Sequence, residues 1–347
     1  MGTELTYREK EVLKYIVDNF VESALPIGSR NISKRTDLNL SSATIRNVMS
    51  DLEDMELLKT PHTSAGRIPT DKGYRYYVDI LMNDQRLTEK EKKLLKSQML
   101  EKKSLIIENE EIYIETSRIL GKISHQLAVV TKPVFDNAVF EKLEIVNISS
   151  SKILVVINIK SGYAKTVLIE MQSEVPRTKM EDLARFLNER LQGLTLREIK
   201  ETFQERVHDY RLQEPELIQL FINSKDELYG ESAGNANVFI GGTGEIITQP
   251  EFGDPKSFKN IIELAEDKSL VVHIFESSNN IEEGIMISIG DENPDEKLRD
   301  YSVISTSYRI DDIKGNIGII GPKRMNYAKM VSLIKYTSEL ISELNKK

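Results

Sequence analysis

Apolar residues in the first sixty positions recur at three- and four-residue spacing, which is the period of amphipathic helices. The sequence Thr6-Tyr7-Arg8-Glu9 is typical of a capping box at a helix start, and an apolar stripe follows over residues 12–21. Ser29 is placed to cap a second, short helix, and Ser41 to cap a third over about 42–56. Three short helices with a tight turn before the third form the pattern of a helix-turn-helix.

The third helix has two faces of different chemistry. At about 100° per residue, its buried stripe comprises Ile45, Val48, Met49, Leu52 and Met55. The opposite face carries, in its N-terminal half, Ser42, Ala43, Thr44, Arg46, Asn47 and Ser50. In the major groove an arginine can donate two hydrogen bonds to guanine, and an asparagine can pair with adenine. Acidic residues gather in the C-terminal half, over 51–56, so we expect the N-terminal end to enter the groove.

The segment after the third helix has the pattern of a hairpin. Leu57-Leu58-Lys59 predicts a short strand, and Ser64-Ala65-Gly66 is a turn signal before a second extended run. Thr70-Asp71 then begins another helix, whose predicted inward positions are Tyr74, Tyr77, Val78 and Leu81. A hairpin that follows a helix-turn-helix is a wing, so this region is predicted to be a winged helix.

The distribution of charge supports a surface that faces phosphate. The whole chain has a net charge of −8, which argues against general binding to polyanions. Residues 28–49 and 59–75 nevertheless each carry four Lys or Arg against a single Asp, a net charge of +3. We therefore predict DNA contacts from Arg30, Lys34, Ser42, Ala43, Thr44, Arg46, Asn47, Ser50, His62, Thr63, Ser64, Arg67 and Lys72.

These predicted contacts divide into two roles. Arg46 and Asn47 are expected to specify bases, whereas Arg67 and Lys72 are expected to contact phosphate or enter the adjacent minor groove. Winged helices also serve as protein-binding modules, so the periodicity alone leaves both kinds of ligand open.

Two stretches carry a family resemblance. The sequence Ser41-Ser42-Ala43-Thr44-Ile45-Arg46-Asn47 and the later stretch PHTSAGRIPTDKGYR at residues 61–75 resemble the heat-inducible transcription repressor HrcA family. Val48 departs from the family pattern, in which an acidic residue is common after the Arg-Asn pair. Because Val48 falls on the predicted buried side, this departure concerns local packing and not the base-reading face.

The resemblance implies a repressor of heat-shock, or chaperone, operons. Its expected partners are double-stranded DNA with an inverted-repeat operator and a chaperonin that keeps the repressor active until heat stress. A homodimer is expected, because a two-fold dimer matches a palindromic operator.

The middle of the chain changes from helical to alternating periodicity. Residues 88–127 predict long helices with dense outward charge, and a coiled coil is an alternative even though no a/d heptad persists. Strands over 142–148, 152–159 and 164–169 predict an antiparallel meander, and helices follow at 180–191, 195–203 and 214–228.

The last third of the chain predicts mixed elements: a strand-turn-strand at 238–247, a helix at 255–265, strands at 270–275, 284–289, 301–308 and 313–320, and a helix ending near 344. The order strands, helices, strands, helix predicts an α+β domain interrupted by a mainly helical insertion. By resemblance these are a GAF-like domain and an inserted dimerisation domain. The predicted domains are a winged helix at 1–82, a helical connector at 83–130, the GAF-like domain at 131–175 and 271–347, and the inserted domain at 176–270.

Candidate chemistry elsewhere is sparse. The chain has no cysteine, and its four histidines are scattered, so we expect no disulfide, no metal site and no cofactor. Gly241-Gly242-Thr243-Gly244 lacks the Lys-Ser/Thr of a phosphate loop and predicts a glycine-rich hairpin. The acidic pairs Glu282-Glu283 and Asp311-Asp312 have no matched nucleophile, base and oxyanion donor, so they predict solvated surface and no enzyme.

Two further expectations concern location and ligands. The longest aliphatic run, 153–157, is too short to span a bilayer, and the first ten residues lead into no apolar segment, so we expect a cytoplasmic protein with no membrane partner. An alternative function is a metabolite-sensing transcription regulator with a ligand in the GAF-like domain, although fold alone does not license that inference. A third function, an enzyme with a DNA-binding appendage, would need a polar constellation that the sequence does not show.

Overall fold

The structure is a computed structural model that describes residues 4–34, 40–61, 66–100, 110–133, 135, 137–160, 162, 164–171, 175–211, 214–230, 238–277, 284–310 and 313–344. The chain forms two compact units. The first comprises Met1–Thr131, Val238–Ser307 and Asn316–Leu344, and the second consists mainly of Lys132–Asn237 with Tyr308–Gly315. The second unit begins at Lys132 and its main part ends at Asn237, whereas the inserted domain is predicted to have boundaries near 176 and 270. The GAF-like and dimerisation roles of the predicted domains stay predictions.

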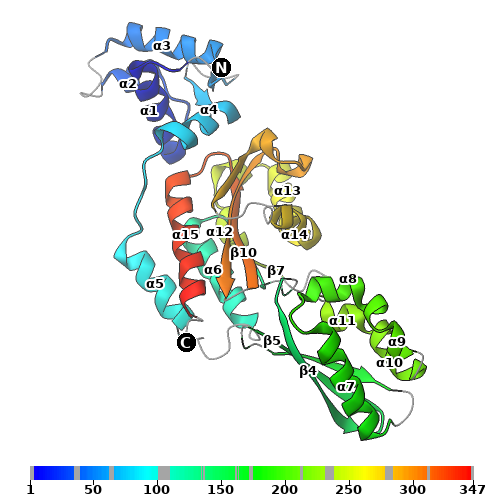
Figure 1. Ribbon diagram of the computed structural model, residues 1–347. Coiled ribbons are helices and arrows are strands. Elements are labelled where there is room, and N and C mark those ends of the chain that lie inside the picture. Colours follow the sequence, from blue (N-terminus) through cyan, green and yellow to red (C-terminus); the bar gives the residue numbers. More distant parts are fainter. Residues whose placement is uncertain are drawn as a thin grey trace. The chain divides into compact units, whose positions relative to one another are not determined.

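The N-terminal part of the first unit is a winged helix (Figure 1). Its elements are α1 (Tyr7–Ser23), α2 (Ser29–Ser33), α3 (Ser42–Asp54), β1 (Leu58–Lys59), β2 (Ile68–Pro69) and α4 (Asp71–Tyr76), which continues as one π-helical turn over Tyr77–Leu81. The predicted capping box at Thr6 and Glu9 is confirmed, as is the cap from Ser41, whose hydroxyl accepts the Thr44 N–H at 3.1 Å. The predicted cap at Ser29 is wrong, because α2 already includes Ser29 and Gly28 occupies the capping position.

The core of the winged helix lies where α1 meets α3. Val12 and Ile16 of α1 and Ile45 and Leu52 of α3 are fully buried. The predicted buried stripe of α3 is confirmed at its first four positions, but Met55 is only half-buried because α3 ends before it. Each fully buried aliphatic side chain contributes about 1.5–3 kcal/mol relative to an exposed one.

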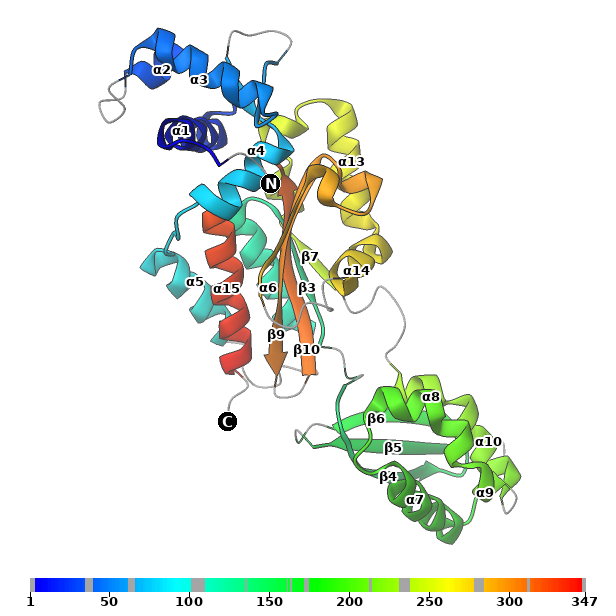
Figure 2. The ribbon, with the colours of Figure 1, turned by 45° about the horizontal axis from the view of Figure 1, so that its top comes forward.

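The remainder of the first unit is built around a five-stranded sheet with the order β7-β3-β10-β9-β8, which we call the central sheet. Its strands are β3 (Leu127–Thr131), β7 (Val238–Gly241), β8 (Met286–Ile289), β9 (Tyr301–Ile310) and β10 (Ile313–Pro322). Figure 2 shows α13 (Pro255–Glu266) and α14 (Lys268–Ser277) on one side of this sheet, and α6 (Glu110–Ser124) and α15 (Tyr327–Leu344) on the other. Helix α5 (Glu89–Leu100) contacts α6 and α15.

Three predictions in this region are wrong. The helix expected to reach residue 127 ends near Ser124, and Leu127–Thr131 is the buried strand β3. The strand expected at 270–275 lies in helix α14. The predicted glycine-rich hairpin is a strand followed by the short helix α12 (Thr243–Ile246). Gly242 has φ +86° there, and a Cβ at this position would overlap the Gln126 carbonyl oxygen.

The second unit contains the predicted antiparallel meander of β4 (Phe140–Ser149), β5 (Lys152–Ile159) and β6 (Ala164–Glu170). Its helices are α7 (Arg177–Leu191), α8 (Leu196–Arg206), α9 (His208–Arg211), α10 (Pro215–Asn223) and α11 (Lys225–Tyr229). The Asn188 side chain of α7 binds both the Leu143 N–H, at 2.6 Å, and the Leu143 carbonyl, at 2.9 Å. Helices α7 and α8 confirm two of the predicted helices, whereas the helix predicted over 214–228 is divided at Ser224 into α10 and α11. The two bonds of Asn188 fix α7 against β4.

Candidate nucleic-acid interface

The predicted reading face of α3 is open to solvent. Ala43, Arg46, Asn47 and Ser50 are exposed, whereas Val48 on the opposite side is 9% exposed. Arg46 has no ion-pair partner among the residues that the structure describes. Its guanidinium can therefore approach a base edge without first breaking an internal pair.

The remaining two positions of this face serve the fold as well. Ser42 is half-buried, and its hydroxyl lies 3.1 Å from that of Ser29, which links α3 to α2. Thr44 is half-buried too, and its hydroxyl lies 2.8 Å from that of the capping Ser41. These hydroxyls hold the first turn of α3 in place, so the exposed residues next to them have a fixed direction.

The wing is tied to α3 by a cluster around Glu53. The Glu53 carboxylate accepts the Thr60 hydroxyl at 2.6 Å and the Arg67 Nε at 2.8 Å. Hydrogen bonding from Thr60, with the nearby Arg67 charge, lowers the pKa of Glu53. The backbone of Arg67 also exchanges two hydrogen bonds of 2.9 Å with Ile27. The structure thus gives Arg67 a role in positioning the wing, and its phosphate contact stays a prediction.

Other predicted cations are more available. Lys72 lies 3.3 Å from the Glu56 carboxylate, and both side chains are mostly exposed, so this pair is weak and can exchange for phosphate. Arg30 and Lys34 are exposed at the end of α2. Lys59 on β1 is also exposed, and it was not among the predicted site residues although the charge count of 59–75 includes it. The predicted contacts His62, Thr63 and Ser64 lie outside the described residues.

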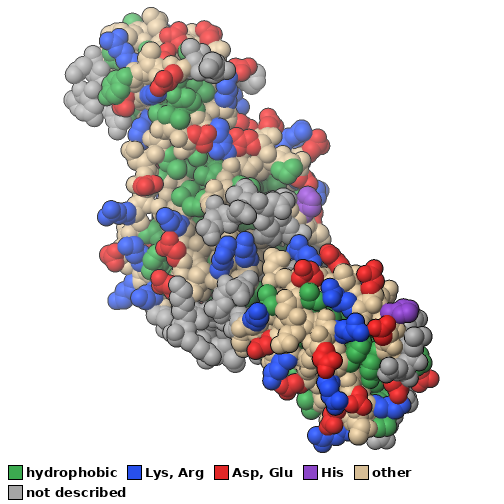
Figure 3. Space-filling view, in the orientation of Figure 1, with side chains coloured by type: hydrophobic (Ala, Val, Ile, Leu, Met, Phe, Trp, Pro, Cys, Tyr) green, Lys and Arg blue, Asp and Glu red, His purple; other side chains and the backbone are tan. Residues whose placement is uncertain are grey.

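The second unit carries charges of both signs on the face that is in view. Basic and acidic side chains are interspersed over its visible face (Figure 3). A phosphate backbone is contacted by clustered cations. The net charge of +3 over residues 28–49 and over 59–75 makes the winged helix the better candidate for contact with nucleic acid.

Comparison with known proteins identifies the family. A model of the winged helix-turn-helix of the transcription repressor HrcA, its DNA-binding domain, matches residues 4–84, and a model of the HrcA C-terminal domain matches residues 110–331. The heat-inducible transcription repressors HrcA of Chlorobium limicola and Chlorobaculum tepidum are 40% and 42% identical to the chain, each over 98% of the chain and 97% of the relative. The chain belongs to the HrcA family of heat-inducible transcription repressors.

The HrcA assignment places α3 within a DNA-binding winged-helix domain. A crystal structure described as that of a hypothetical protein shares the fold, with a TM-score of 0.56 and 22% identity over 99% of each chain. None of the helices formed by the described residues has the length and apolar character to cross a membrane. Those residues also contain no group of three or more histidine and acidic side chains placed to hold a metal ion.

Proposed function

We propose that this HrcA chain is a homodimer that represses chaperone operons by reading the two halves of an inverted repeat. The observation that carries the proposal is the exposed Arg46-Asn47 pair on the N-terminal half of a recognition helix whose other face is buried. Arg46 would donate two hydrogen bonds to guanine, and Asn47 would pair with adenine. Ala43 lies on the same face and offers a methyl group to thymine.

The acidic residues of α3 set the direction of docking. Asp51, Asp54 and Glu56 are exposed toward the C-terminal end of the helix, and Glu53 is occupied by Thr60 and Arg67. Phosphates would repel these carboxylates, so the N-terminal half of α3 enters the groove. Lys59, Lys72 and Arg30 then contact the backbone and contribute affinity without sequence information.

The outer face of the β4–β6 sheet supports the homodimer. Val146, Leu154 and Leu168 are neighbours across its three strands, and Val146 and Leu168 are 44% and 50% exposed. Ile148 adds an exposed side chain at 57%. An ion pair between Lys152 and Glu170, at 2.9 Å, borders this row. A second copy of the same face would cover the apolar row and place charges of both signs opposite one another.

The role of the chaperonin in this proposal comes from the family resemblance alone. A chaperonin that maintains the active repressor would be occupied by unfolded proteins during heat stress, and repression would then fall. This predicts that added chaperonin raises the fraction of protein that binds the operator.

Fluorescence anisotropy at fixed salt tests the proposal. The purified protein is titrated onto a labelled inverted repeat and onto a scrambled duplex, with and without chaperonin. We expect selective binding of one dimer per repeat, with more active protein when chaperonin is present. Equal, weak binding to both duplexes in every condition would contradict sequence reading.

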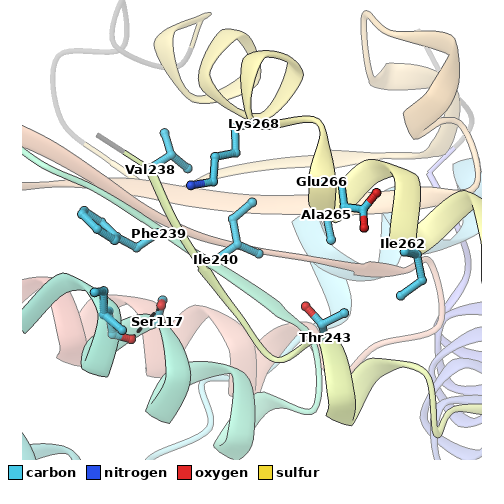
Figure 4. Close-up of a pocket in the computed structure, with 10 residues that line it drawn as sticks. Ser117, Val238, Phe239, Ile240, Thr243, Ile262, Ala265, Glu266 and Lys268 are labelled. Atoms are coloured by element: carbon cyan, nitrogen blue, oxygen red, sulfur yellow. Dashed lines mark hydrogen bonds between the residues drawn. The ribbon is translucent and has the colours of Figure 1, made fainter. Parts of the chain in front are cut away.

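A second candidate function has one observation in its favour. A cavity of about 540 Å³ lies beside β7, between α6 and the helices α13 and α14 (Figure 4). Val238, Ile240 and Ile262 form apolar walls, and the Lys268 side chain extends across the opening toward β7. This volume is within the range of small-molecule sites. The Lys268 ammonium would pair with the carboxylate of a small amphipathic acid, and the Glu266 carboxylate, which also lines the cavity, would favour a hydrogen-bond donor elsewhere on that ligand.

Thermal unfolding tests this alternative. A ligand that binds only the native state must raise the melting temperature. A panel of aliphatic and aromatic carboxylic acids is added to the protein and to the Lys268→Met variant. A shift in the original protein that the variant lacks would support a metabolite-sensing repressor, and no shift with any acid would remove this candidate.

A further inference from the structure

The winged helix and the central sheet are joined by ionic contacts within the first unit. Arg75 of α4 forms a two-pronged pair with Glu292, with Nε 2.8 Å from Oε1 and Nη2 2.5 Å from Oε2. The same Nη2 donates to the Ile287 carbonyl of β8 at 2.6 Å. Glu292 is itself held in place, because it accepts the Ile289 N–H at 2.8 Å. Arg75 is therefore committed to the sheet and is not available to phosphate.

A second contact lies one turn earlier on α4. The Asp71 carboxylate is 2.8 Å from the Lys323 ammonium and accepts the Asp291 N–H at 3.2 Å. It rests directly over Gly290, which has φ +58°. A Cβ at Gly290 would overlap the Asp71 carboxylate, so the close approach requires a glycine.

A third contact reaches α1. Arg324 is only 12% exposed; it donates from Nε and Nη2 to the two oxygens of the Glu251 carboxylate, and from Nη1 to the Val21 carbonyl. The rings of Tyr74 and Tyr327 pack with their centroids 5.9 Å apart between these ionic groups. The docking contacts thus involve both α1 and α4 of the winged helix.

These contacts do not cover the reading face. Ala43, Arg46, Asn47 and Ser50 stay exposed while Asp71 and Arg75 are docked. Without the docking contacts, the covalent link between the two parts is the segment Met82–Thr88, which contains no helix or strand. The Ser332 hydroxyl of α15 donates to the Gln85 carbonyl and Leu87 is 7% exposed, so the free part of this segment is Met82–Asp84. At about 3.3–3.6 Å per extended residue, these three residues still allow an undocked winged helix to move by about 10 Å.

We propose that Asp71 and Arg75 are positioning residues that lock the winged helix onto the central sheet and so restrict the positions that the two winged helices of a dimer can take on the operator. The inference rests on the dimeric function proposed above. Once one winged helix of the dimer is bound, the second binds its half-site as an intramolecular event, at an effective concentration that depends on how well its position is restricted. Loss of the Asp71 and Arg75 contacts lowers that effective concentration and leaves the affinity of one winged helix for one half-site unchanged.

The first experiment compares binding of the full inverted repeat with binding of a single half-site. Arg75→Glu and Glu292→Arg each break the pair, and the double exchange restores it with reversed charge. Each single variant should lose about tenfold or more in affinity for the full repeat, with little change on the half-site, and the double variant should recover most of the loss. Arg8→Glu and Lys259→Glu, at exposed positions outside the contacts, are the controls for the added negative charge.

Equal losses on the full repeat and on the half-site would overturn the inference, because they would indicate a direct or general electrostatic effect on DNA contact. Full-repeat affinity that stays unchanged in both single variants would overturn it as well. If the original protein gains nothing on the full repeat over the half-site, the dimeric function itself fails, and the inference fails with it.

A second measurement tests the docking without DNA. The chain contains no cysteine, so Arg8→Cys and Lys259→Cys give two unique attachment points for a fluorescent donor and acceptor. In the labelled protein without further changes, we expect a narrow distribution of energy-transfer efficiency. The distribution should broaden in Arg75→Glu and in Gly290→Ala, and it should narrow again in the double variant Arg75→Glu, Glu292→Arg. Circular dichroism confirms that each variant is folded. An unchanged distribution in both Arg75→Glu and Gly290→Ala would overturn the inference whatever the DNA result.

Discussion

Arg46→Ala isolates base reading from protein stability. Arg46 is exposed and, among the described residues, has no ion-pair partner, so its removal leaves no buried charge and no cavity. Surface changes of this kind usually alter the free energy of unfolding by less than about 0.5 kcal/mol. A two-pronged arginine–guanine contact is worth about 1–3 kcal/mol of discrimination, which is about 5- to 160-fold in affinity for one half-site.

In the proposed dimer this effect doubles. Two copies of Arg46 read the two halves of the repeat, so the loss on the full operator should approach about 2–6 kcal/mol if the sites add. Anisotropy titrations at fixed salt would compare the operator, a single half-site, and a scrambled duplex, with Arg8→Ala as the matched exposed control. Binding to the scrambled duplex should change little. An equal loss on the operator and on the scrambled duplex would refute the base-reading role.

Five other substitutions follow from the same structure. Arg67→Ala should lower the free energy of unfolding by about 1 kcal/mol through loss of its bond to Glu53. Lys72→Ala should reduce the salt dependence of DNA binding by about one phosphate contact. If Arg67→Ala reduces the salt dependence of binding more than Lys72→Ala does, these roles are reversed. Gly242→Ala should destabilise the first unit by about 1–3 kcal/mol, because its φ is +86° and a Cβ would overlap the Gln126 carbonyl; an unchanged denaturant midpoint would count against this packing. The Lys329 ammonium lowers the pKa of Glu91 to about 2, so this pair stabilises the fold above the usual carboxyl pKa and its contribution is lost as pH falls toward 2. In denaturant unfolding, the loss in free energy of unfolding caused by Glu91→Gln should therefore be smaller at pH 3 than at pH 6. A loss that is the same at both pH values would contradict this linkage. Leu168→Lys should place a charge in the exposed apolar row of β4–β6 and shift sedimentation toward the monomer without loss of helix content, whereas an unchanged dimer would place the interface elsewhere.

The winged helix could be predicted in detail because its signals are local. Thr6 with Glu9, and Ser41 before α3, mark helix starts through side chain to backbone bonds only three residues apart. The 3.6-residue period then separates Ile45 and Leu52 from Arg46 and Asn47. Local patterns of this kind also predicted the β4–β6 meander.

The errors arise where apolar runs carry no period. Leu127–Thr131 is buried at every position, as in a strand covered on both sides, and continues directly from a helical pattern. The helix ends at His125, whose φ of +56° is a left-handed stop that the sequence does not signal through glycine. In α14 the Asp267 carboxylate accepts the Leu270 N–H at 3.0 Å, and this start signal could have corrected the predicted strand.

The docking of the winged helix could not be predicted from the sequence. Arg75 and Glu292 are 217 positions apart, and each lies in a charged surface pattern that is consistent with solvent exposure. Arg75 counted toward the basic segment 59–75, although the structure neutralises it with Glu292 and Asp79. Only the folded chain distinguishes cations that face phosphate from cations that hold the domain in place.

Removal of a single acceptor atom from guanine shows whether Arg46 reads that base in the major groove. Each guanine of the operator is replaced in turn by 7-deazaguanine, which lacks N7, and binding is measured for the original protein and for Arg46→Ala. We expect that one substitution per half-site weakens binding by the original protein and has no further effect on binding by Arg46→Ala. Equal weakening of both proteins at every guanine, or none at any guanine, would contradict base reading by Arg46.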